Sequence, residues 1–593
     1  MRSARAIDAT VVLMLCASAC VSARDRPRGP VPDLQLRAPP RPRDLGYGGR
    51  FRVDAVFSGE APADARVTWR QLSGAPLRDV RVDRGGLLFE ANMPAANDVG
   101  LSPPSTGVVP VSPRTSAEVV LEAAWRPDGG ETVRRRVRLS AASRSRGLST
   151  VASGAGVLLA GSGWEVASAP PGGSRALLDG GGFTRFFPDA TGRWVLRDAT
   201  GRATSFRAAR YDETPLDCGR SGCHEAIASA AQRSPMTFAL RTLLDRGLAN
   251  AAECAAACHA TGELDVNDGG FDCVARELGV RLDADWAALP RDLRRVGGVT
   301  CLACHGPAAI PEPQSRWSIL RADVCETCHD APPEYGHVAA WMSSRMARAD
   351  ADPKARSTAP CARCHTTAGF VSSVTSSVPR TPPADAGPMG IGCAACHAVH
   401  DARGSAPSDA LLREVDLPAA FDRVPLASRV CVPCHAPDGR IPAASAAAVW
   451  AGRGGVEPMT GAPLEAALVH GEVPGGCVGC HRLGPPDLAR GAAHAFRADL
   501  GGCVSCHGGR MPDTDAAARD LREEARALSA RLASSLNLEP HEKGVATADD
   551  PVGRALFDVL LVLRDPAAAA HNAPYARELL AAAGRVATSG ARR

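Results

Sequence analysis

The chain has 593 residues, which predicts several domains rather than one. Aromatic residues are few (13 Phe, 8 Trp and 4 Tyr), whereas Gly and Pro number 59 and 47, so large aromatic cores are not expected. Lys and Arg outnumber Asp and Glu by only 68 to 64, and no basic block with interleaved aromatic residues occurs, which excludes a nucleic-acid partner.

Residues 1–23 are predicted to be an export leader. Arg2 and Arg5 precede an apolar run, residues 9–19, that is too short to span a bilayer. Residues 17–20 (Ala-Ser-Ala-Cys) resemble the lipobox of bacterial lipoproteins, in which Cys20 would receive lipid, although leucine is usual at the first position. Cleavage after residues 21–23 (Val-Ser-Ala), without lipid, is the alternative. No other stretch reaches 18 apolar residues, so no transmembrane helix is expected.

Residues 24–46 are rich in Pro and Arg, which predicts an extended, semi-rigid linker. Between residues 47 and 210, short segments alternate polar and apolar residues between Gly, Pro and Asp. This is the pattern of antiparallel strands in a β-sandwich. The predicted strands include residues 50–57, 66–71, 117–125 and 132–139.

Part of this region resembles PKD-type immunoglobulin-like domains. Residues 68–74 (Thr-Trp-Arg-Gln-Leu-Ser-Gly) resemble their strand–turn pattern, and residues 187–194 (Phe-Pro-Asp-Ala-Thr-Gly-Arg-Trp) resemble the late-strand signature of a shorter copy. The resemblance implies an immunoglobulin-like β-sandwich over residues 47–146 and a second, shorter β domain over residues 147–210. Such modules space or dock other domains, and no catalytic constellation is visible in them.

Nine cysteine pairs, each followed directly by a histidine, lie between residues 211 and 511. Seven have the spacing Cys-x-x-Cys-His, and the first two are stretched. In chain order, motifs 1 to 9 are Cys218/Cys223/His224, Cys254/Cys258/His259, Cys301/Cys304/His305, Cys325/Cys328/His329, Cys361/Cys364/His365, Cys393/Cys396/His397, Cys431/Cys434/His435, Cys477/Cys480/His481 and Cys503/Cys506/His507. Cys-x-x-Cys-His is the attachment site of c-type haem, whose iron takes the histidine as proximal ligand. We therefore expect about nine haems, held by these cysteines and histidines.

Zinc is the alternative interpretation, because cysteine pairs also build zinc sites with four cysteines or with two cysteines and two histidines. Only 15 residues are histidine, however, and one follows every pair, which favours haem. The two stretched motifs are less typical, since the attachment machinery prefers the standard spacing. Cys273 lies outside the motifs and is expected to be a buried, small apolar side chain.

The motifs are dense, at about 30 residues each, which is too few for separate haem pockets. The haems are therefore expected to pack on one another, and this region is expected to fold only with haem. Because c-type haem is attached outside the bacterial cytoplasm, we expect a periplasmic or outer-surface protein, lipid-anchored if Cys20 is modified. Haem propionates would make the loaded protein more negative than its formal net charge of +4.

Residues 512–593 are predicted to form helices. Asp513 or Thr514 can cap the first helix, Asp550 and Pro551 open the second, and the last is expected to begin near Pro574. Apolar residues at helical spacing define their buried faces: Leu521, Leu528 and Leu532 in the first, Leu556, Val559, Leu560 and Leu563 in the second, and Tyr575, Leu579 and Leu580 in the last.

Each haem iron also takes a distal ligand or keeps an open position, and this choice sets its reduction potential and its chemistry. Six histidines lie outside the motifs and are candidate distal ligands: His337, His400, His470, His494, His541 and His571. His541 can equally be a solvated loop residue. Even if all six bind iron, three haems need another ligand or stay open.

Several of these residues occur in patterns that resemble a group of multihaem c-type cytochromes, which includes pentahaem nitrite reductase and octahaem hydroxylamine oxidoreductase. Residues 392–400 resemble its Cys-x-x-Cys-His-x-x-His element, and residues 299–307 resemble another recurring element. Residues 571–580 resemble its C-terminal helix, whose histidine reaches back to a haem. The resemblance spans residues 211–585 and implies a haem-packed, mostly helical or irregular domain. It implies distal-ligand roles for His400, His470, His494 and His571.

Two departures from this group point to methionine. The group often has Trp-x-x-Ser-x-His after a motif, whereas residues 341–346 end in Met346, and residues 234–236 (Ser-Pro-Met) repeat the change after motif 1. We therefore expect Met236 and Met346 to be distal ligands. The alternative is that each is a core residue on a helix. The ninth haem takes Met342, Met389, Met459 or Met511, or stays open.

Two functions are consistent with this composition. The first is electron transfer, in which packed haems form a wire between a membrane donor and an extracytoplasmic acceptor, with redox proteins as partners. The second is reduction or oxidation of small nitrogen or sulfur compounds at one open haem. The Cys-x-x-Cys-Lys motif of the related nitrite reductases does not occur. The four tyrosines, Tyr47, Tyr211, Tyr335 and Tyr575, show no match to the cross-linked tyrosine of hydroxylamine oxidoreductases. The sequence therefore favours electron transfer.

Overall fold

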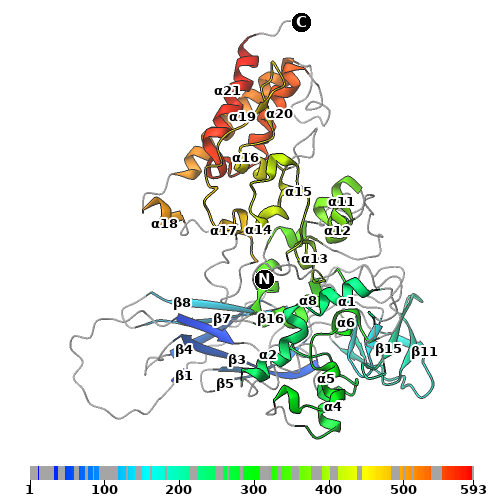
Figure 1. The fold of residues 1–593 in the computed structure, drawn as a ribbon. Helices are drawn as coiled ribbons and strands as arrows, with labels where there is room; N and C mark the ends of the chain where they lie inside the picture. Colours follow the sequence, from blue (N-terminus) through cyan, green and yellow to red (C-terminus); the bar gives the residue numbers. More distant parts are fainter. Residues whose placement is uncertain are drawn as a thin grey trace, which may run out of the picture. The chain divides into compact units, whose positions relative to one another are not determined.

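In the computed structural model, the chain forms two compact units (Figure 1). The first unit comprises Met1–Ser373, Val378–Leu411 and Gly484–Ala495, and the second comprises Val374–Ser377, Leu412–Leu483 and Phe496–Arg593. The structure describes residues 11–12, 33–37, 47–58, 66–73, 78–83, 86–92, 118–127, 131–140, 150–160, 163–180, 183–213, 218–219, 224–246, 258–262, 266–280, 285–307, 319–320, 322–331, 335–342, 344–349, 359–375, 390–400, 412–436, 444–481, 494–498, 503–508, 513–535 and 550–589. Among the helices of these residues, none has the length and apolar character to cross a membrane.

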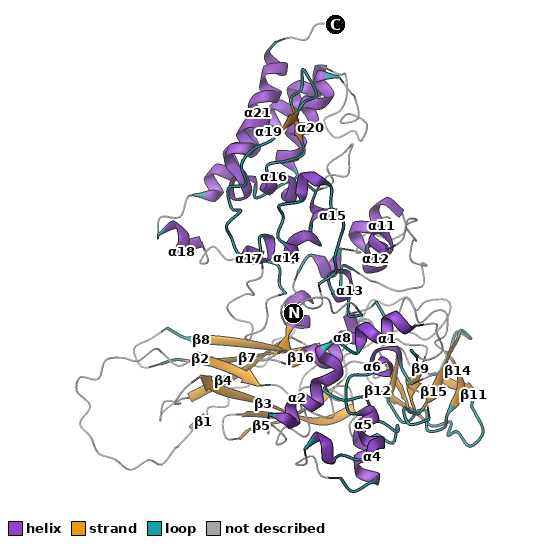
Figure 2. Cartoon of the chain, viewed as in Figure 1, coloured by secondary structure: helices purple, strands orange, loops and turns teal. Residues whose placement is uncertain are grey.

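The N-terminal part of the first unit consists of two four-stranded antiparallel sheets (Figure 2). Their orders are β2-β3-β6-β5 and β1-β4-β7-β8. The strands are β1 (Val11–Val12), β2 (Asp33–Arg37), β3 (Tyr47–Ser58), β4 (Arg66–Ser73), β5 (Arg78–Asp83), β6 (Gly86–Asn92), β7 (Glu118–Trp125) and β8 (Val133–Ser140). The four strands predicted from alternation coincide with β3, β4, β7 and β8. In β4, Val67 and Trp69 are buried while Thr68 is exposed, and Phe57 of β3 packs edge-on against Trp125 of β7 with ring centres 5.0 Å apart.

Seven further strands form two smaller sheets, with the orders β10-β13-β12 and β11-β14-β15-β9. They are β9 (Thr150–Ala152), β10 (Val157–Ala160), β11 (Glu165–Ser168), β12 (Leu177–Gly180), β13 (Phe183–Phe186), β14 (Gly192–Arg197) and β15 (Ala203–Ala209). Their common core contains Phe186 and Trp194, which meet edge-on at 4.8 Å. The Trp194 indole N–H donates to the Ala190 carbonyl at 3.0 Å, so the buried indole keeps a hydrogen-bond partner.

Short helices follow along the rest of the first unit. They are α1 (Glu225–Ala231), η2 (Pro235–Phe238), α2 (Ala239–Asp245), α4 (Phe271–Glu277), η4 (Trp286–Ala288), α5 (Arg291–Val296), α6 (Cys301–His305), α8 (Ala322–His329), α9 (His337–Met342), η5 (Met346–Arg348), α11 (Ala359–His365), α12 (Thr367–Thr375) and α13 (Cys393–Cys396), with a small hairpin of β16 (Asp330–Ala331) and β17 (Tyr335–Gly336). Cys273 is buried on α4, as predicted for a small apolar residue.

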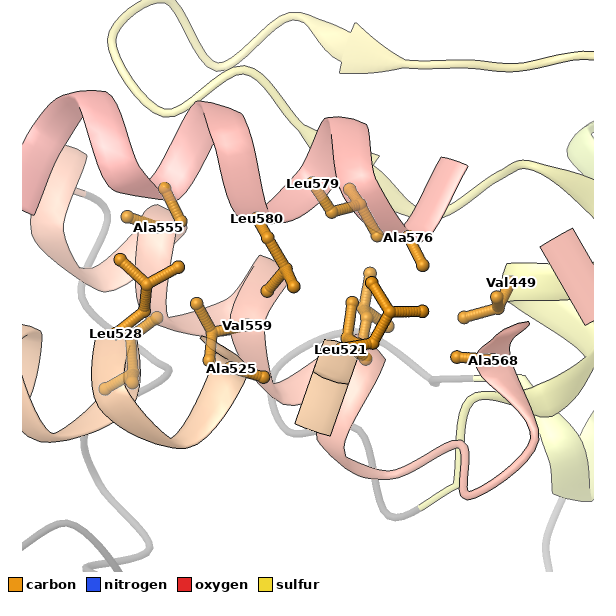
Figure 3. Close-up of a cluster of buried hydrophobic side chains, with 14 of the residues drawn as sticks. Val449, Leu521, Ala525, Leu528, Ala555, Val559, Ala568, Ala576, Leu579 and Leu580 are labelled. Carbon is orange, nitrogen blue, oxygen red and sulfur yellow. The ribbon is translucent and has the colours of Figure 1, made fainter. Parts of the chain in front are cut away.

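The second unit combines short helices with a C-terminal helical bundle. Its elements are η7 (Ala419–Phe421), α14 (Leu426–Arg429), α15 (Val432–His435), α16 (Ala446–Ala451), β18 (Gly455–Val456), β19 (Pro463–Leu464), α17 (Cys477–His481), α18 (Val504–His507), α19 (Thr514–Ser535), α20 (Pro551–Leu563) and α21 (Ala568–Thr588). Leu521, Leu528, Val559, Leu579 and Leu580 lie in one buried cluster between α19, α20 and α21, as Figure 3 shows. The helical region predicted after residue 512 is therefore confirmed.

The ends of these helices follow from local side chains. Asp513 accepts a hydrogen bond from the Ala516 N–H at 2.8 Å, and Asp550 accepts from Val552 and Gly553, so both predicted caps are present. The last helix, α21, begins at Ala568 rather than near Pro574, and its backbone breaks at Asn572 (φ −164°, ψ 79°). The prediction located the second half of α21 and missed the short turn before it.

Asp558 gives the stability of the second unit a pH dependence. Its carboxyl group is buried on α20, where Oδ1 accepts from the Val456 N–H at 3.0 Å. Within the described part of the chain, Oδ2 has no hydrogen-bond partner. Burial, opposed by the Val456 hydrogen bond and reinforced by the charge of Glu457, raises the pKa of Asp558 to about 8.

The folded chain thus keeps a proton that the unfolded chain releases above the ordinary pKa of 3.8. The free energy of unfolding should therefore fall as the pH rises from about 4 to about 8. We expect Asp558→Asn to abolish this fall, which is worth up to about 6 kcal/mol at about 1.4 kcal/mol per pKa unit. Urea unfolding at the two ends of this pH range measures it, with the exposed Asp520→Asn as control. A wild-type midpoint that does not fall with pH would contradict the expectation.

Candidate functional site

Each of the seven regular motifs occupies about one turn of helix. They coincide with α6, with the last turns of α8 and α11, and with α13, α15, α17 and α18. Residues three and four apart share one face of a helix, so both cysteines and the histidine of a motif lie on the same side. The two stretched motifs are described only in part, because Cys223 and Cys254 lie outside the described residues. In motif 9, the side chain of Cys506 also lies outside them.

The motif cysteines that the structure describes are thiols, and no disulfide joins any two of them. Cys301, Cys361 and Cys480 are exposed, whereas Cys273, outside the motifs, is fully buried. The remaining motif cysteines are half-buried: Cys218, Cys258, Cys304, Cys325, Cys328, Cys364, Cys393, Cys396, Cys431, Cys434, Cys477 and Cys503.

The sequence predicts a thioether bond between haem and each motif sulfur atom. A thiol is the group from which such a bond is made, whereas a disulfide between the two cysteines of a motif would block it. The attachment of these sulfur atoms to haem stays a prediction.

Five motif histidines each face a different histidine from outside the motifs. The ring centres are 6.0 Å apart for His305 and His400, 6.2 Å for His329 and His337, 6.2 Å for His397 and His494, 6.5 Å for His507 and His470, and 6.1 Å for His481 and His571. These five are all the candidate distal histidines that the structure describes, since His541 lies outside it. The structure therefore brings each of them to a separate motif.

These separations fit one metal ion held between two imidazoles. A metal–imidazole bond is about 2 Å long, and the ring centre lies about 1 Å behind the bonding nitrogen, so two imidazoles on opposite sides of one ion have centres about 6 Å apart. Among the described residues, no three or more His, Cys, Asp or Glu side chains gather as a metal site. A haem iron takes only two ligands from the protein, and the porphyrin supplies the rest. The paired imidazoles and their adjoining cysteines therefore fit c-type haem.

Hydrogen bonds at Nδ1 fix the orientation of several rings. Nδ1 of His365 lies 2.6 Å from the Ala349 carbonyl oxygen, and Nδ1 of His481 lies 3.4 Å from the Phe496 carbonyl oxygen. A carbonyl only accepts, so Nδ1 donates in both and Nε2 keeps the lone pair that a metal needs. Phe496 adopts a left-handed conformation (φ 52°), which is uncommon for a residue with a side chain and is enriched at functional sites.

Neighbouring motifs of the first unit contact one another. The thiols of Cys218 and Cys301 are hydrogen-bonded, which joins motifs 1 and 3, and those of Cys325 and Cys393 join motifs 4 and 6. The rings of His337 and His494, which face motifs 4 and 6, have centres 4.7 Å apart. Burial, and then the nearby His400 and His224, lower the pKa of His305, which favours the neutral, metal-binding imidazole.

The motifs of the second unit are joined in the same way. Cys477 is hydrogen-bonded to Cys431, which joins motifs 8 and 7, and this contact is the main cause that lowers the pKa of Cys477 to about 6. Cys480 is close enough to Cys503 for their charges to interact, which places motif 9 beside motif 8. His470 Nδ1 lies 3.5 Å from the His571 carbonyl oxygen, so the two non-motif histidines of motifs 9 and 8 are also linked.

A buried carboxylate lies behind His571. The ring Nδ1 is 2.7 Å from Oδ2 of Asp565, whose side chain is fully buried. Burial lowers the pKa of His571, but the hydrogen bond and charge of Asp565 outweigh it, and the net shift is upward. Nothing in the sequence singles out Asp565, because an Asp-Pro pair before a helix is a common start signal and the pairing appears only in three dimensions.

Four motif histidines face no second imidazole among the described residues: His224, His259, His365 and His435. Near His259, the Thr261 hydroxyl donates to the Gly298 carbonyl at 2.7 Å, and the Val299 N–H donates to the Met236 carbonyl at 3.2 Å. The backbone of Met236 and the side chain of Thr261, two residues after motif 2, therefore meet at the same short segment, Gly298 and Val299.

The other methionine candidates differ in position. The Ala349 carbonyl, three residues after Met346, lies at Nδ1 of His365, so the backbone of this segment contacts motif 5. Met459 is 62 % exposed on the turn between β18 and β19. Met389 and Met511 lie outside the described residues, and so does the side chain of Met342.

Comparisons with models of protein families, with curated proteins and with solved structures each find no match to this chain.

Proposed function

We propose that the chain is an exported c-type cytochrome with about nine haems that transfers electrons between a membrane donor and an extracytoplasmic acceptor. One observation carries the proposal: five motif histidines each face a different non-motif histidine at 6.0 to 6.5 Å. The motif cysteines would hold each haem covalently, and the paired imidazoles would be its two axial ligands. When bound, each haem would supply a one-electron redox centre.

Contacts between motifs support transfer along a file of haems. In the first unit, motif 1 contacts motif 3 through Cys218 and Cys301. Motif 3 connects to motif 6, because His400, which faces motif 3, comes three residues after His397 of motif 6. Motif 6 in turn adjoins motif 4 through the two facing rings at 4.7 Å. This predicts the order 1–3–6–4 in the first unit.

In the second unit, the hydrogen bond between Cys431 and Cys477 and the proximity of Cys480 to Cys503 predict the order 7–8–9. Sites that share contacting side chains are close enough for electrons to pass directly between them. Paired histidines give lower reduction potentials than a histidine–methionine pair, so these five sites would form the low-potential part of the wire.

A reductase or oxidase of small nitrogen or sulfur compounds is the second candidate. It is favoured by the four motif histidines that face no second imidazole among the described residues. An iron held at such a motif would have a position for substrate unless Met236, Met346, His541 or another side chain fills it. The two candidates therefore differ in the coordination of these four sites.

The N-terminal part would hold the cytochrome at a surface. We infer that the two four-stranded sheets form an immunoglobulin-like sandwich, because Phe57 and Trp125 join them through packed aromatic rings. The resemblance to PKD-type domains and to the multihaem cytochrome group is part of this proposal, as is lipid attachment at Cys20, which lies outside the described residues.

The haem content of the purified protein, after expression with the c-type haem attachment machinery, tests the proposed function. The pyridine haemochrome assay should give about nine haems per chain. If carbon monoxide leaves the spectrum of the dithionite-reduced protein unchanged, all irons are six-coordinate and electron transfer is favoured. A shift of part of the Soret band would favour the enzyme instead. Absence of c-type haem bands would exclude both functions.

The second prediction concerns His494. Because its ring faces His397 at 6.2 Å, His494→Ala should open the iron of motif 6, and carbon monoxide should bind one more haem per chain than in the wild type. Replacement of the exposed neighbour Arg497 by Ala is the matched control and should not change carbon monoxide binding. Identical carbon monoxide spectra of His494→Ala and the wild type would show that another side chain is the ligand.

A further inference from the structure

The carboxylate of Asp565 is the one buried acid that the structure places in hydrogen-bond contact with a candidate axial histidine among the described residues. Oδ2 lies 2.7 Å from Nδ1 of His571, and the Asp565 side chain is fully buried while that of His571 is 19 % exposed. The ring of the same imidazole also lies near that of His481 of motif 8, with ring centres 6.1 Å apart. His571 is therefore close both to a fixed carboxylate and to a motif histidine.

The chain fixes both partners by separate means. Oδ1 of Asp565 accepts from the Ala567 N–H at 3.0 Å, which holds the carboxylate at the start of α21. Asn572 then interrupts α21, and its side chain donates to the Ala467 carbonyl and accepts from the Tyr575 N–H. The turn that carries His571 is thereby held between the Asp565 hydrogen bond to Ala567 and the break at Asn572.

A carboxylate that is hydrogen-bonded to an axial imidazole changes the electronic properties of the bound metal. Its hydrogen bond fixes the ring so that Nε2 faces the iron, and it increases the electron density that the imidazole donates. A fixed negative charge in a poorly polarisable interior also stabilises the oxidised iron more than the reduced iron. Both effects favour the oxidised state.

The other described pair of the second unit offers a contrast. Among the described residues, the hydrogen-bond partner of His470 Nδ1 is the His571 carbonyl oxygen, at 3.5 Å. A neutral carbonyl at this distance is a weaker acceptor than a carboxylate at 2.7 Å. The haem of motif 9 should therefore lack the effect that motif 8 experiences.

We propose, on the basis of the proposed function, that Asp565 is a positioning residue that lowers the reduction potential of the haem at motif 8 below that of the haem at motif 9. In the predicted order, motif 8 lies between motifs 7 and 9. Asp565 thus makes the middle site of this file harder to reduce than its neighbour at motif 9.

The test is a spectroelectrochemical titration of the full-length haem-loaded protein. Asp565→Asn removes the charge and keeps an oxygen that can accept from the Ala567 N–H. The equilibrium constant for reduction of one haem should then increase at least tenfold. This corresponds to a rise of about 59 mV in its reduction potential for one electron. The matched control is Asp558→Asn, a buried acid of the same bundle that contacts backbone rather than histidine and should leave every potential unchanged.

Asp565→Ser is the second variant, because its hydroxyl can still cap the turn if the Asn variant does not fold. Loss of the low-spin signal of one haem in the Asp565 variants, but not in Asp558→Asn, would also support the proposal, since His571 would then depend on Asp565 for its position. An unchanged titration curve with an unchanged haem count would overturn it and leave the proposed function standing. Absence of haem from the wild type would instead overturn the proposed function.

Discussion

Pairing of imidazoles, in four of five pairs from distant parts of the chain, is the constraint on which the proposed haem region would depend. The motif helices are short, from 4 residues in α13 to 8 in α8, and helices of this length are not stable alone. Their apolar clusters are small, and the chain has few aromatic side chains to enlarge them. With an iron between the rings, as proposed, four of the five pairs would close a long loop by a metal bond, and haem binding would become part of the folding free energy.

The second unit adds a conventional core to this arrangement. In α21, Tyr575, Leu579 and Leu580 are fully buried against α19 and α20, while His571 at the start of the same helix faces motif 8. The break at Asn572 separates the packing of the core from the positioning of His571. The helix axis can change direction there without disturbing the apolar contacts that follow. A packed bundle can thus hold one axial ligand within narrow limits, which a free loop could not do.

Local signals were predictable from the sequence, and long-range pairing was not. The caps at Asp513 and Asp550 and the strands around Trp69 and Trp125 depend on a few neighbouring residues, so propensity and alternation located them. The candidate distal histidines could be named by elimination, but which motif each one faces depends on chain reversals that no spacing encodes. The role of the contact between Asp565 and His571 could not be predicted for the same reason, because it depends on the position of His481, which is far away in the sequence.

Two buried acids of the second unit show how partners decide the role of one residue type. Asp558 has a single backbone N–H donor and a second oxygen without a partner among the described residues, so a proton is favoured and the residue is a neutral acid over much of the pH range. Asp565 has two donors, the Ala567 N–H and the His571 ring. A neutral acid affects only the stability of the bundle. A carboxylate that accepts from an imidazole also acts on whatever that imidazole binds, so the same core that stabilises α21 would set the potential of the proposed redox centre at its edge.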